Sequence, residues 1–287
     1  MYPQLLSLKD WFASDGRHFQ IISQTLFLMY GFYFLGWDAD WLNIIAAFAG
    51  TLIITWLAIK RGMVGRHSLK SALITSLGLS LLLKANSPWL FLLAAVLAIG
   101  QKVLIRPGNK HLWNPANFGI VAVVILSGSA WISPGQWGSG ALLIFIIGSL
   151  GLAVLSKIKR LETGFTFLIV LSSLEAARSI FYMGWGADVW LHKMSSGSLW
   201  LFALFMITDP MTSPNSRPMR ILWATGIAIV SFVLANFYFI NAAPFWVLFF
   251  ATPLNFIIDR LYKSMPFKWF EDNPISISSQ IQITQDK

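Results

Sequence analysis

The chain has 287 residues, of which 56% are hydrophobic and only 11% are charged, and its mean hydropathy is +0.65. A soluble domain carries about 25% charged residues, so the composition excludes an ordinary soluble protein and predicts one that faces lipid. Cysteine is absent from the sequence, which excludes disulfides, thiolate-held iron–sulfur clusters and cysteine nucleophiles.

Ten apolar segments approach the length of about 20 residues that a helix needs to cross a bilayer. The third, fourth, fifth and eighth are short or broken by Pro and Gly. We therefore expect an all-α integral membrane protein with ten transmembrane helices between residues 19 and 260. The N-terminal segment (1–18) and the polar tail (261–287) should lie outside the membrane, on the cytoplasmic side. The segments lie near residues 19–36, 40–59, 70–84, 88–104, 115–130, 138–156, 163–183, 196–208, 219–240 and 243–259.

The distribution of positive charge supports this count. Eighteen of the 21 Lys and Arg residues lie in the termini or in alternate loops, leaving Lys84, Lys193 and Arg178 elsewhere. Basic loops stay cytoplasmic, so both termini are predicted on the cytoplasmic side of a bacterial-type inner membrane. The net charge of +9 therefore reflects topology, and no nucleic-acid partner is expected.

Each half of the ten-segment pattern contains a polar interruption. "RPGNKHLWNPANFG" (106–119) opens the fifth segment, and "TDPMTSPNSRP" (208–218) follows the eighth. Proline ends or begins a helix abruptly, and non-helical backbone at membrane depth requires a protein or aqueous surrounding. Paired interruptions in two halves indicate an intramembrane site, so pseudo-repeats 19–130 and 138–259 with inverted topology are expected.

The two interruptions contain side chains that can cap exposed backbone amides and side chains that can bind an anion. Asn114 precedes Pro115 and Asp209 precedes Pro210, where both can cap exposed amides. Thr212, Ser213 and Arg217 add hydroxyls and a positive charge that suit a phosphate. The alternative is that these residues only end helices at the cytoplasmic surface. From the residues alone, the cargo stays open.

The same segments resemble a known family. "FALFMITDPMTSPNSRPMRILWATGIAI", "KHLWNPANFGIVAVVIL" and "HKMSSGSLW" are similar to signatures of RnfD and NqrB, the membrane components of the Rnf and Nqr redox complexes. A closing "PLNFIID" (253–259) agrees in order and spacing, so the resemblance covers about residues 70–260.

The resemblance implies two inverted five-helix repeats and electron transport across the membrane through flavins, coupled to sodium or proton movement. It implies a non-covalent FMN or riboflavin near Asn114, Pro115, Ser196, Gly197, Asp209, Thr212, Ser213 and Arg217. Partners would be the lipid bilayer, other redox subunits or a soluble electron carrier.

The sequence departs from the family at its covalent flavin tether, normally a threonine in an "SGAT" motif. The nearest approximations are Ser127-Gly128-Ser129-Ala130 and Gly138-Ser139-Gly140-Ala141, and neither has the threonine. Covalent FMN is therefore not expected, and the loop is closer to that of stand-alone relatives of RnfD.

Other polar residues have simpler expected roles. Glu175 and Arg178 are three residues apart in one span, where they can pair and neutralise one another. The alternative is a functional role, which ionisable groups inside a span often have. Asp259 should pair with Arg260 or the neighbouring basic tail, and the four histidines do not form a metal site. Three functions remain open: a flavin-binding electron-transfer subunit, a small-solute transporter or channel of the same fold, or a membrane anchor for a redox partner. A self-contained enzyme is not expected.

Overall fold

The structure, a computed structural model, describes residues 15–37, 40–106, 110–133 and 141–267. Most of the predicted terminal segments, and Gly138 to Gly140 of the second tether candidate, lie outside these ranges.

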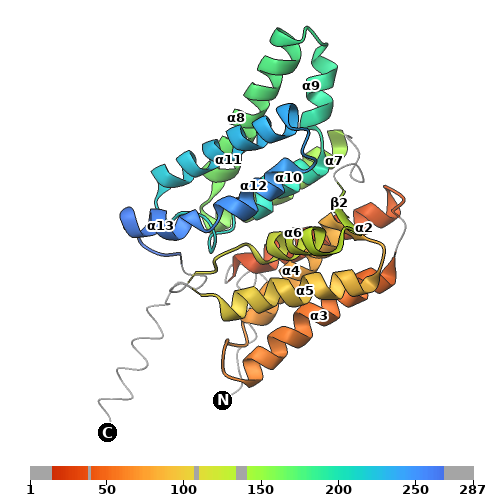
Figure 1. Cartoon of the computed structure of the whole chain (residues 1–287), viewed down its shortest axis with the longest axis vertical. Helices are drawn as coiled ribbons and strands as arrows, with labels where there is room; N and C mark the ends of the chain where they lie inside the picture. Colours follow the sequence, from red (N-terminus) through yellow and green to blue (C-terminus); the bar gives the residue numbers. More distant parts are fainter. Residues whose placement is uncertain (1–14, 38–39, 107–109, 134–140, 268–287) are drawn as a thin grey trace.

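The described chain is built almost entirely of helices, arranged as two neighbouring groups (Figure 1). One group comes from the first half of the sequence and the other from the second half. The first contains α2 (Gly16–Tyr33), α3 (Trp41–Lys60), α4 (Ser68–Leu82), β1 (Leu83–Ala85), α5 (Pro88–Leu104), α6 (Pro115–Ser127) and β2 (Ala130–Ile132). The second contains α7 (Ala141–Ile158), α8 (Leu161–Ala176), the π-helix η2 (Ala177–Tyr182), α9 (Ala187–Met194), α10 (Gly197–Leu201), the π-helix η3 (Phe202–Met206), α11 (Arg217–Phe237), α12 (Ala243–Ala251) and α13 (Leu254–Leu261).

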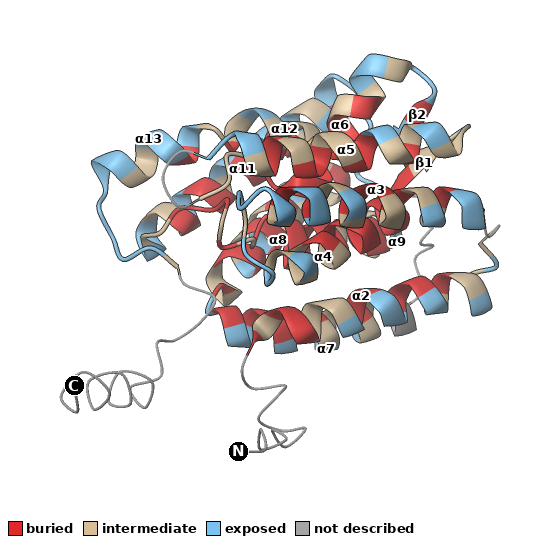
Figure 2. Cartoon of the chain, turned by 90° about the horizontal axis from the view of Figure 1, so that it is seen from below, coloured by how far each residue is buried: buried red, intermediate tan, exposed pale blue. Residues whose placement is uncertain are grey.

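Three described helices are long and apolar enough to cross a membrane: Trp41–Lys60, Leu161–Tyr182 and Arg217–Phe237. Several shorter apolar helices accompany them, among them Ser68–Leu82 and Pro88–Leu104. Large apolar side chains such as Ile45, Phe145 and Ile169 are 60%, 71% and 62% exposed, which suits contact with lipid tails. Figure 2 shows exposed residues, in pale blue, alternating with buried ones along the helices. The expected class, an all-helical membrane protein, is confirmed, whereas the count of ten spans and the inverted repeat stay predictions.

Helix boundaries follow local chemistry. Ser87 caps α5 by accepting a hydrogen bond from the Trp89 N–H, and Pro88 occupies the first helical position, where its missing donor costs nothing. Asp15 caps α2 in the same way through the Arg17 N–H. These helices therefore begin within a few residues of the predicted positions.

Three local features differ from the predicted segments. The ends of the third and fifth segments form the antiparallel strands β1 and β2, because Leu83 is extended and Gly128 adopts a left-handed conformation. The tenth segment is split into α12 and α13 around Thr252-Pro253, where Pro253 cannot donate to the helix ladder. The loop expected before the eighth segment contains the short helix α9.

Packing is similar in the two groups. In the first, α3 packs on α5 and α5 packs on α6; in the second, α8 packs on α11 and α11 packs on α12. Contacts of α2 with α7 and of α6 with α12 join the groups. Two glycines permit close approach to the backbone of another helix: a Cβ at Gly119 would lie 2.5 Å from the Ala94 carbonyl oxygen, and one at Gly164 would lie 2.6 Å from that of Ala203. Small residues are the usual means of such helix contact in membranes.

Candidate functional site

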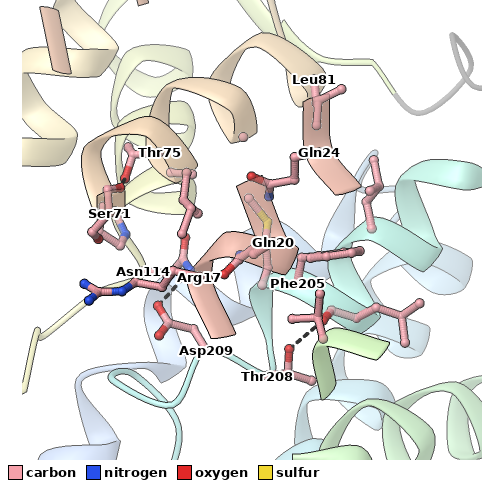
Figure 3. Close-up of a pocket in the computed structure, with 18 of the residues that line it drawn as sticks. Arg17, Gln20, Gln24, Ser71, Thr75, Leu81, Asn114, Phe205, Thr208 and Asp209 are labelled. Atoms are coloured by element: carbon pink, nitrogen blue, oxygen red, sulfur yellow. Dashed lines mark hydrogen bonds between the residues drawn. The ribbon is translucent and has the colours of Figure 1, made fainter. Parts of the chain in front are cut away.

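The two polar interruptions meet. Asn114 Nδ2 donates a hydrogen bond to Asp209 Oδ2 at 3.0 Å, joining residues that are 95 positions apart in the chain (Figure 3). The expected convergence of the two interrupted segments is therefore present in the structure.

Both side chains also cap the backbone, as expected. Asn114 Oδ1 accepts from the Asn117 N–H at 3.1 Å in the first turn of α6, where Pro115 occupies the first position. Asp209 Oδ1 accepts from the Met211 N–H at 2.9 Å in the turn after η3. Each residue thus satisfies a freed amide with one oxygen and uses another atom to contact the other interruption.

A cavity of about 60 Å³ lies beside this contact and is lined by residues of α2, α4, α6, α7, α10 and η3. Its polar lining includes Arg17, Gln20, Gln24, Ser71, Thr75, Thr208 and the Asn114–Asp209 pair, several of which are labelled in Figure 3. Gln24 is buried, and its Oε1 has no hydrogen-bond partner among the described residues. A cavity of this size holds a few water molecules, whereas pockets for drug-sized ligands span about 300–1,000 Å³.

The predicted site residues do not all meet at this cavity. Asn114, Pro115 and Asp209 line it. Thr212 and Ser213 do not line the cavity and are buried in the loop after η3. Their backbone carbonyls accept hydrogen bonds from Asn255 and Lys110 respectively.

The other three predicted residues lie elsewhere. Arg217 is exposed and lines a separate hollow of about 660 Å³ together with Lys159 and Glu162. Ser196 lines a pocket of about 420 Å³, and Gly197 is the first residue of α10. Ser196 and Gly197 begin the eighth segment whereas Asp209 follows it, so the structure does not bring all eight residues to one cavity.

Charged residues hold the loop after η3 (residues 207–216) in place through hydrogen bonds and an ion pair. Asp259 of α13 accepts from Lys110 Nζ at 2.7 Å and from the Asn215 N–H at 2.8 Å. Arg160 Nη1 donates to the Pro214 carbonyl at 2.9 Å. The predicted Asp259–Arg260 pair is therefore wrong, because α13 turns Asp259 toward the loop and leaves Arg260 exposed.

Burial shifts the pKa values of these cations. Burial lowers the pKa of Lys110 below its ordinary value, although the Asp259 carboxylate opposes the shift. Burial, followed by repulsion from Arg220, lowers the pKa of Arg160 to about 10. Both shifts act against the charged form, and attraction to nearby carboxylates, Asp259 among them in each case, opposes them.

Several residues that line the cavity, on α2 and α4, are not among the predicted ones. Arg17, Gln20 and Gln24 recur at spacings of three and four residues, and Ser71 and Thr75 are four residues apart. Polar residues on one face of an apolar helix are the sequence signal by which such a lining can be recognised.

Lys102 is a further functional candidate outside the predicted set. It is buried on α5, and its Nζ donates to the hydroxyl of Ser71, one of the residues that line the cavity. Its position within an apolar run is the sequence signal, because a buried cation in a membrane helix requires a polar partner.

The predicted Glu175–Arg178 pair is wrong as well. Glu175 Oε2 accepts from Lys193 Nζ at 2.8 Å, while Arg178 donates to the Asn236 carbonyl at 3.4 Å and lies over the Phe237 ring. Both residues thus contact Asn236 of α11 rather than one another, near the π-helix that begins at Ala177.

The fold and this site define a class: a helical membrane protein in which two interrupted segments meet at a small polar cavity. Residues 125–268, about half of the chain, match the model of the NQR2, RnfD, RnfE family. The chain belongs to this family.

A curated relative gives the same assignment. The chain is 33% identical over 160 residues to a protein of Stutzerimonas stutzeri that is named as the D component of an ion-translocating oxidoreductase complex. That match covers 53% of this chain and 44% of the relative, so the matched region spans less than half of the relative's length.

Proposed function

We propose that the chain is the membrane-embedded subunit of a redox complex and passes electrons by means of a non-covalently bound flavin, FMN or riboflavin. The observation that carries the proposal is the family membership over residues 125–268, which contain the Asp209 interruption. The relative from Stutzerimonas stutzeri is named as part of an ion-translocating oxidoreductase complex, which supports further redox subunits as partners.

The proposal includes ten membrane spans in two inverted five-helix repeats, with both termini on the cytoplasmic side of a bacterial inner membrane. The matching packing in the two groups supports the repeat: α3 against α5 corresponds to α8 against α11, and α5 against α6 corresponds to α11 against α12. The contacts of α2 with α7 and of α6 with α12 are those expected at a pseudo-twofold axis, because each joins equivalent members of the two halves.

Covalent attachment of the flavin is not part of the proposal. Ser127, in the described tether candidate, donates its hydroxyl to the Val123 carbonyl at 2.8 Å and lies in the last turn of α6. Ala130 stands where the motif has its threonine and offers no hydroxyl, and the family's threonine is absent from both candidates.

The flavin would contact the polar interruptions through its phosphate or ribityl chain, near Asn114 and Asp209. The cavity of about 60 Å³ is too small for a flavin ring, so the ring would occupy an adjoining space opened by side-chain movement. The hydrogen bond from Asn114 Nδ2 to Asp209 Oδ2 holds both side chains in place, which gives the polar end of such a ligand fixed donors and acceptors.

Flavin content tests the proposal. The protein is purified gently from cells supplied with riboflavin, denatured and filtered, and flavin is measured in the filtrate. About one flavin per chain is expected from the wild type, and several-fold less from Asp209→Leu. Ser156→Ala, which alters an exposed serine on α7, serves as the control and should retain the flavin. Flavin that stays on the chain after denaturation would contradict non-covalent binding.

The size of the cavity favours a second candidate function, passage of a small polar solute. A volume of about 60 Å³ fits a few water molecules or a solute of similar size better than a flavin. Uptake of such a solute into proteoliposomes, abolished by Asp209→Leu, would support this candidate in a preparation that binds no flavin.

A further inference from the structure

A second pocket, of about 420 Å³, lies between α8, α10, α11 and the start of α12. Helices α8 and α11 run parallel: Arg220 Nε donates to Glu162 Oε1 at 2.7 Å near their first turns, and Asn236 Nδ2 donates to Glu175 Oε1 near their last. Because Glu162 and Arg220 lie beside the loop after η3, the pocket at Glu175 is at the opposite end of these helices.

An ion pair, formed by Glu175 and Lys193, lies in the lining of this pocket. Glu175 accepts from Lys193 Nζ at 2.8 Å, and Lys193 also donates to Asn236 Oδ1 at 3.1 Å. The Glu175 side chain is 9% exposed, whereas that of Lys193 is 35% exposed. The pair therefore offers a ligand one negative and one positive group with no net charge between them.

Hydroxyl groups complete the polar lining. Ser231 is 1% exposed, and its Oγ has no hydrogen-bond partner in the described part of the chain. Serines in helices commonly donate to the carbonyl one turn back, but the Ser231 hydroxyl does not, so this buried hydroxyl can bond to a ligand. Ser196 Oγ and Ser198 Oγ lie 2.9 Å apart; one donates to the other, and the acceptor keeps its own hydrogen for a further bond.

An apolar groove of about 760 Å³ adjoins the pocket. Its lining includes Trp131, Trp246 and Phe250, and Ile240, Asn241 and Ala242 line both spaces. Apart from Asn241, the residues that line the groove are apolar. A charged, hydroxyl-rich pocket next to an apolar groove suits an amphipathic lipid, which has a polar headgroup beside apolar acyl chains.

We propose that this pocket and groove bind one zwitterionic aminophospholipid of the phosphatidylethanolamine class. The primary ammonium donates to Glu175 and Ser231, the phosphate accepts from Lys193 and a serine hydroxyl, and an acyl chain lies in the groove against Trp246. An anionic lipid without an amine leaves Glu175 with no cationic partner when its phosphate competes for Lys193. A choline headgroup has no N–H to donate to Ser231. The site does not depend on the proposed flavin function.

Lipid retention tests the headgroup preference. Delipidated wild-type protein is mixed with vesicles of phosphatidylethanolamine, phosphatidylcholine or phosphatidylglycerol, re-purified, and its bound lipid counted by native mass spectrometry. About one phosphatidylethanolamine per chain is expected, retained roughly tenfold better than the other two lipids, because of the three headgroups only its ammonium can donate hydrogen bonds to Glu175 and Ser231. Equal retention of the three lipids would overturn the assignment.

Two variants and one competitor locate the lipid. Glu175→Gln and Ser231→Ala should each lower retention several-fold, while Ser156→Ala, at the far end of α7, should leave it unchanged. Ser231→Ala removes only a hydroxyl, so it keeps the test decisive if Glu175→Gln does not fold. Unchanged retention in Ser231→Ala would place the lipid elsewhere. Soluble phosphoethanolamine should compete weakly; competition as strong as that of the lipid would exclude the groove from the site.

Discussion

Asn114 and Asp209, from opposite halves of the chain, are joined by a 3.0 Å hydrogen bond beside a small polar cavity. Each of these residues also caps the backbone at its own interruption, through the Asn117 and Met211 amides respectively. The contact therefore ties the start of α6 to the loop after η3, and the two helix breaks stabilise one another. A hydrogen bond contributes about 0.5–3 kcal/mol to stability, depending on whether a partner is charged, so loss of this contact should be measurable.

The Asn114–Asp209 contact predicts energetic coupling. Asn114→Ala and Asp209→Ala should each lower the melting temperature of the detergent-solubilised protein. The double variant should be less destabilised than the sum of the two, by about 1–3 kcal/mol, because either change already removes the bond. Additive losses would show that the two residues act independently. Asn241→Ala, on the loop before α12, is the control: its effect on stability should add to that of either Asn114→Ala or Asp209→Ala.

Asp15 predicts a dependence of stability on pH. Its carboxylate accepts from the Arg17 side chain and from Lys70 Nζ at 3.0 Å, which ties α2 to the first turn of α4. Burial alone would raise the pKa of Asp15, but the bonds from Arg17 and Lys70 outweigh it and hold the pKa below its ordinary value of 3.8. The unfolded chain therefore takes up this proton first as pH falls.

The stabilisation from Asp15 should be fully present above about pH 5 and lost as the pH falls through its lowered pKa. Melting temperatures measured between neutral and acid pH should fall less steeply for Asp15→Asn than for the wild type. Asparagine still caps a helix, so a lower melting temperature of this variant at neutral pH reports the lost ion pairs rather than the lost cap. Parallel curves for the two proteins would contradict this assignment.

Gly164 predicts a steric limit on helix packing. A Cβ at this position would lie 2.6 Å from the Ala203 carbonyl oxygen, so Gly164→Ala should separate α8 from η3 and cost about 1–3 kcal/mol. Gly226→Ala is the matched control, since Gly226 lies within α11 and a Cβ there meets no atom within 4 Å. The control should be neutral or slightly stabilising, because alanine favours helices over glycine. Equal effects in thermal unfolding would refute the packing argument.

The absence of native cysteine makes the predicted topology directly testable. Met63→Cys lies in the α3–α4 connection and Asp188→Cys lies on α9, and both positions are exposed. With a membrane-impermeant maleimide applied to intact spheroplasts, the thiol at position 188 should react, while that at position 63 should react only after lysis. Labelling of both thiols from one side would contradict the ten-span arrangement.

Much of the helical pattern could be predicted from the sequence because apolar runs and prolines act locally. Asn114-Pro115 and Asp209-Pro210 mark a helix start and a helix end for reasons contained in their own side chains. One departure also has a local cause, because Pro253 splits the last segment. Neither the π-helical turn nor the short helix α9 has a strong signal in composition.

The site is harder to predict because its partners come from distant elements. The convergence of Asn114 and Asp209 follows from paired interruptions, but the lining from Gln24 and Ser71 depends on how α2 and α4 pack. The choice of Lys110 over Arg260 as the partner of Asp259 likewise depends on the direction in which α13 leaves α12. Spacing within one helix restricts which residues share a face, and it does not specify what that face contacts.

Redox cycling of the purified protein tests the central claim most directly. The protein in lipid nanodiscs is supplied with FMN or riboflavin, freed of excess flavin, and titrated with dithionite and then with air while visible absorption is recorded. The account predicts about one flavin per chain that bleaches on reduction, recovers on oxidation and is released on denaturation. Protein that remains colourless after incubation with either flavin would contradict it.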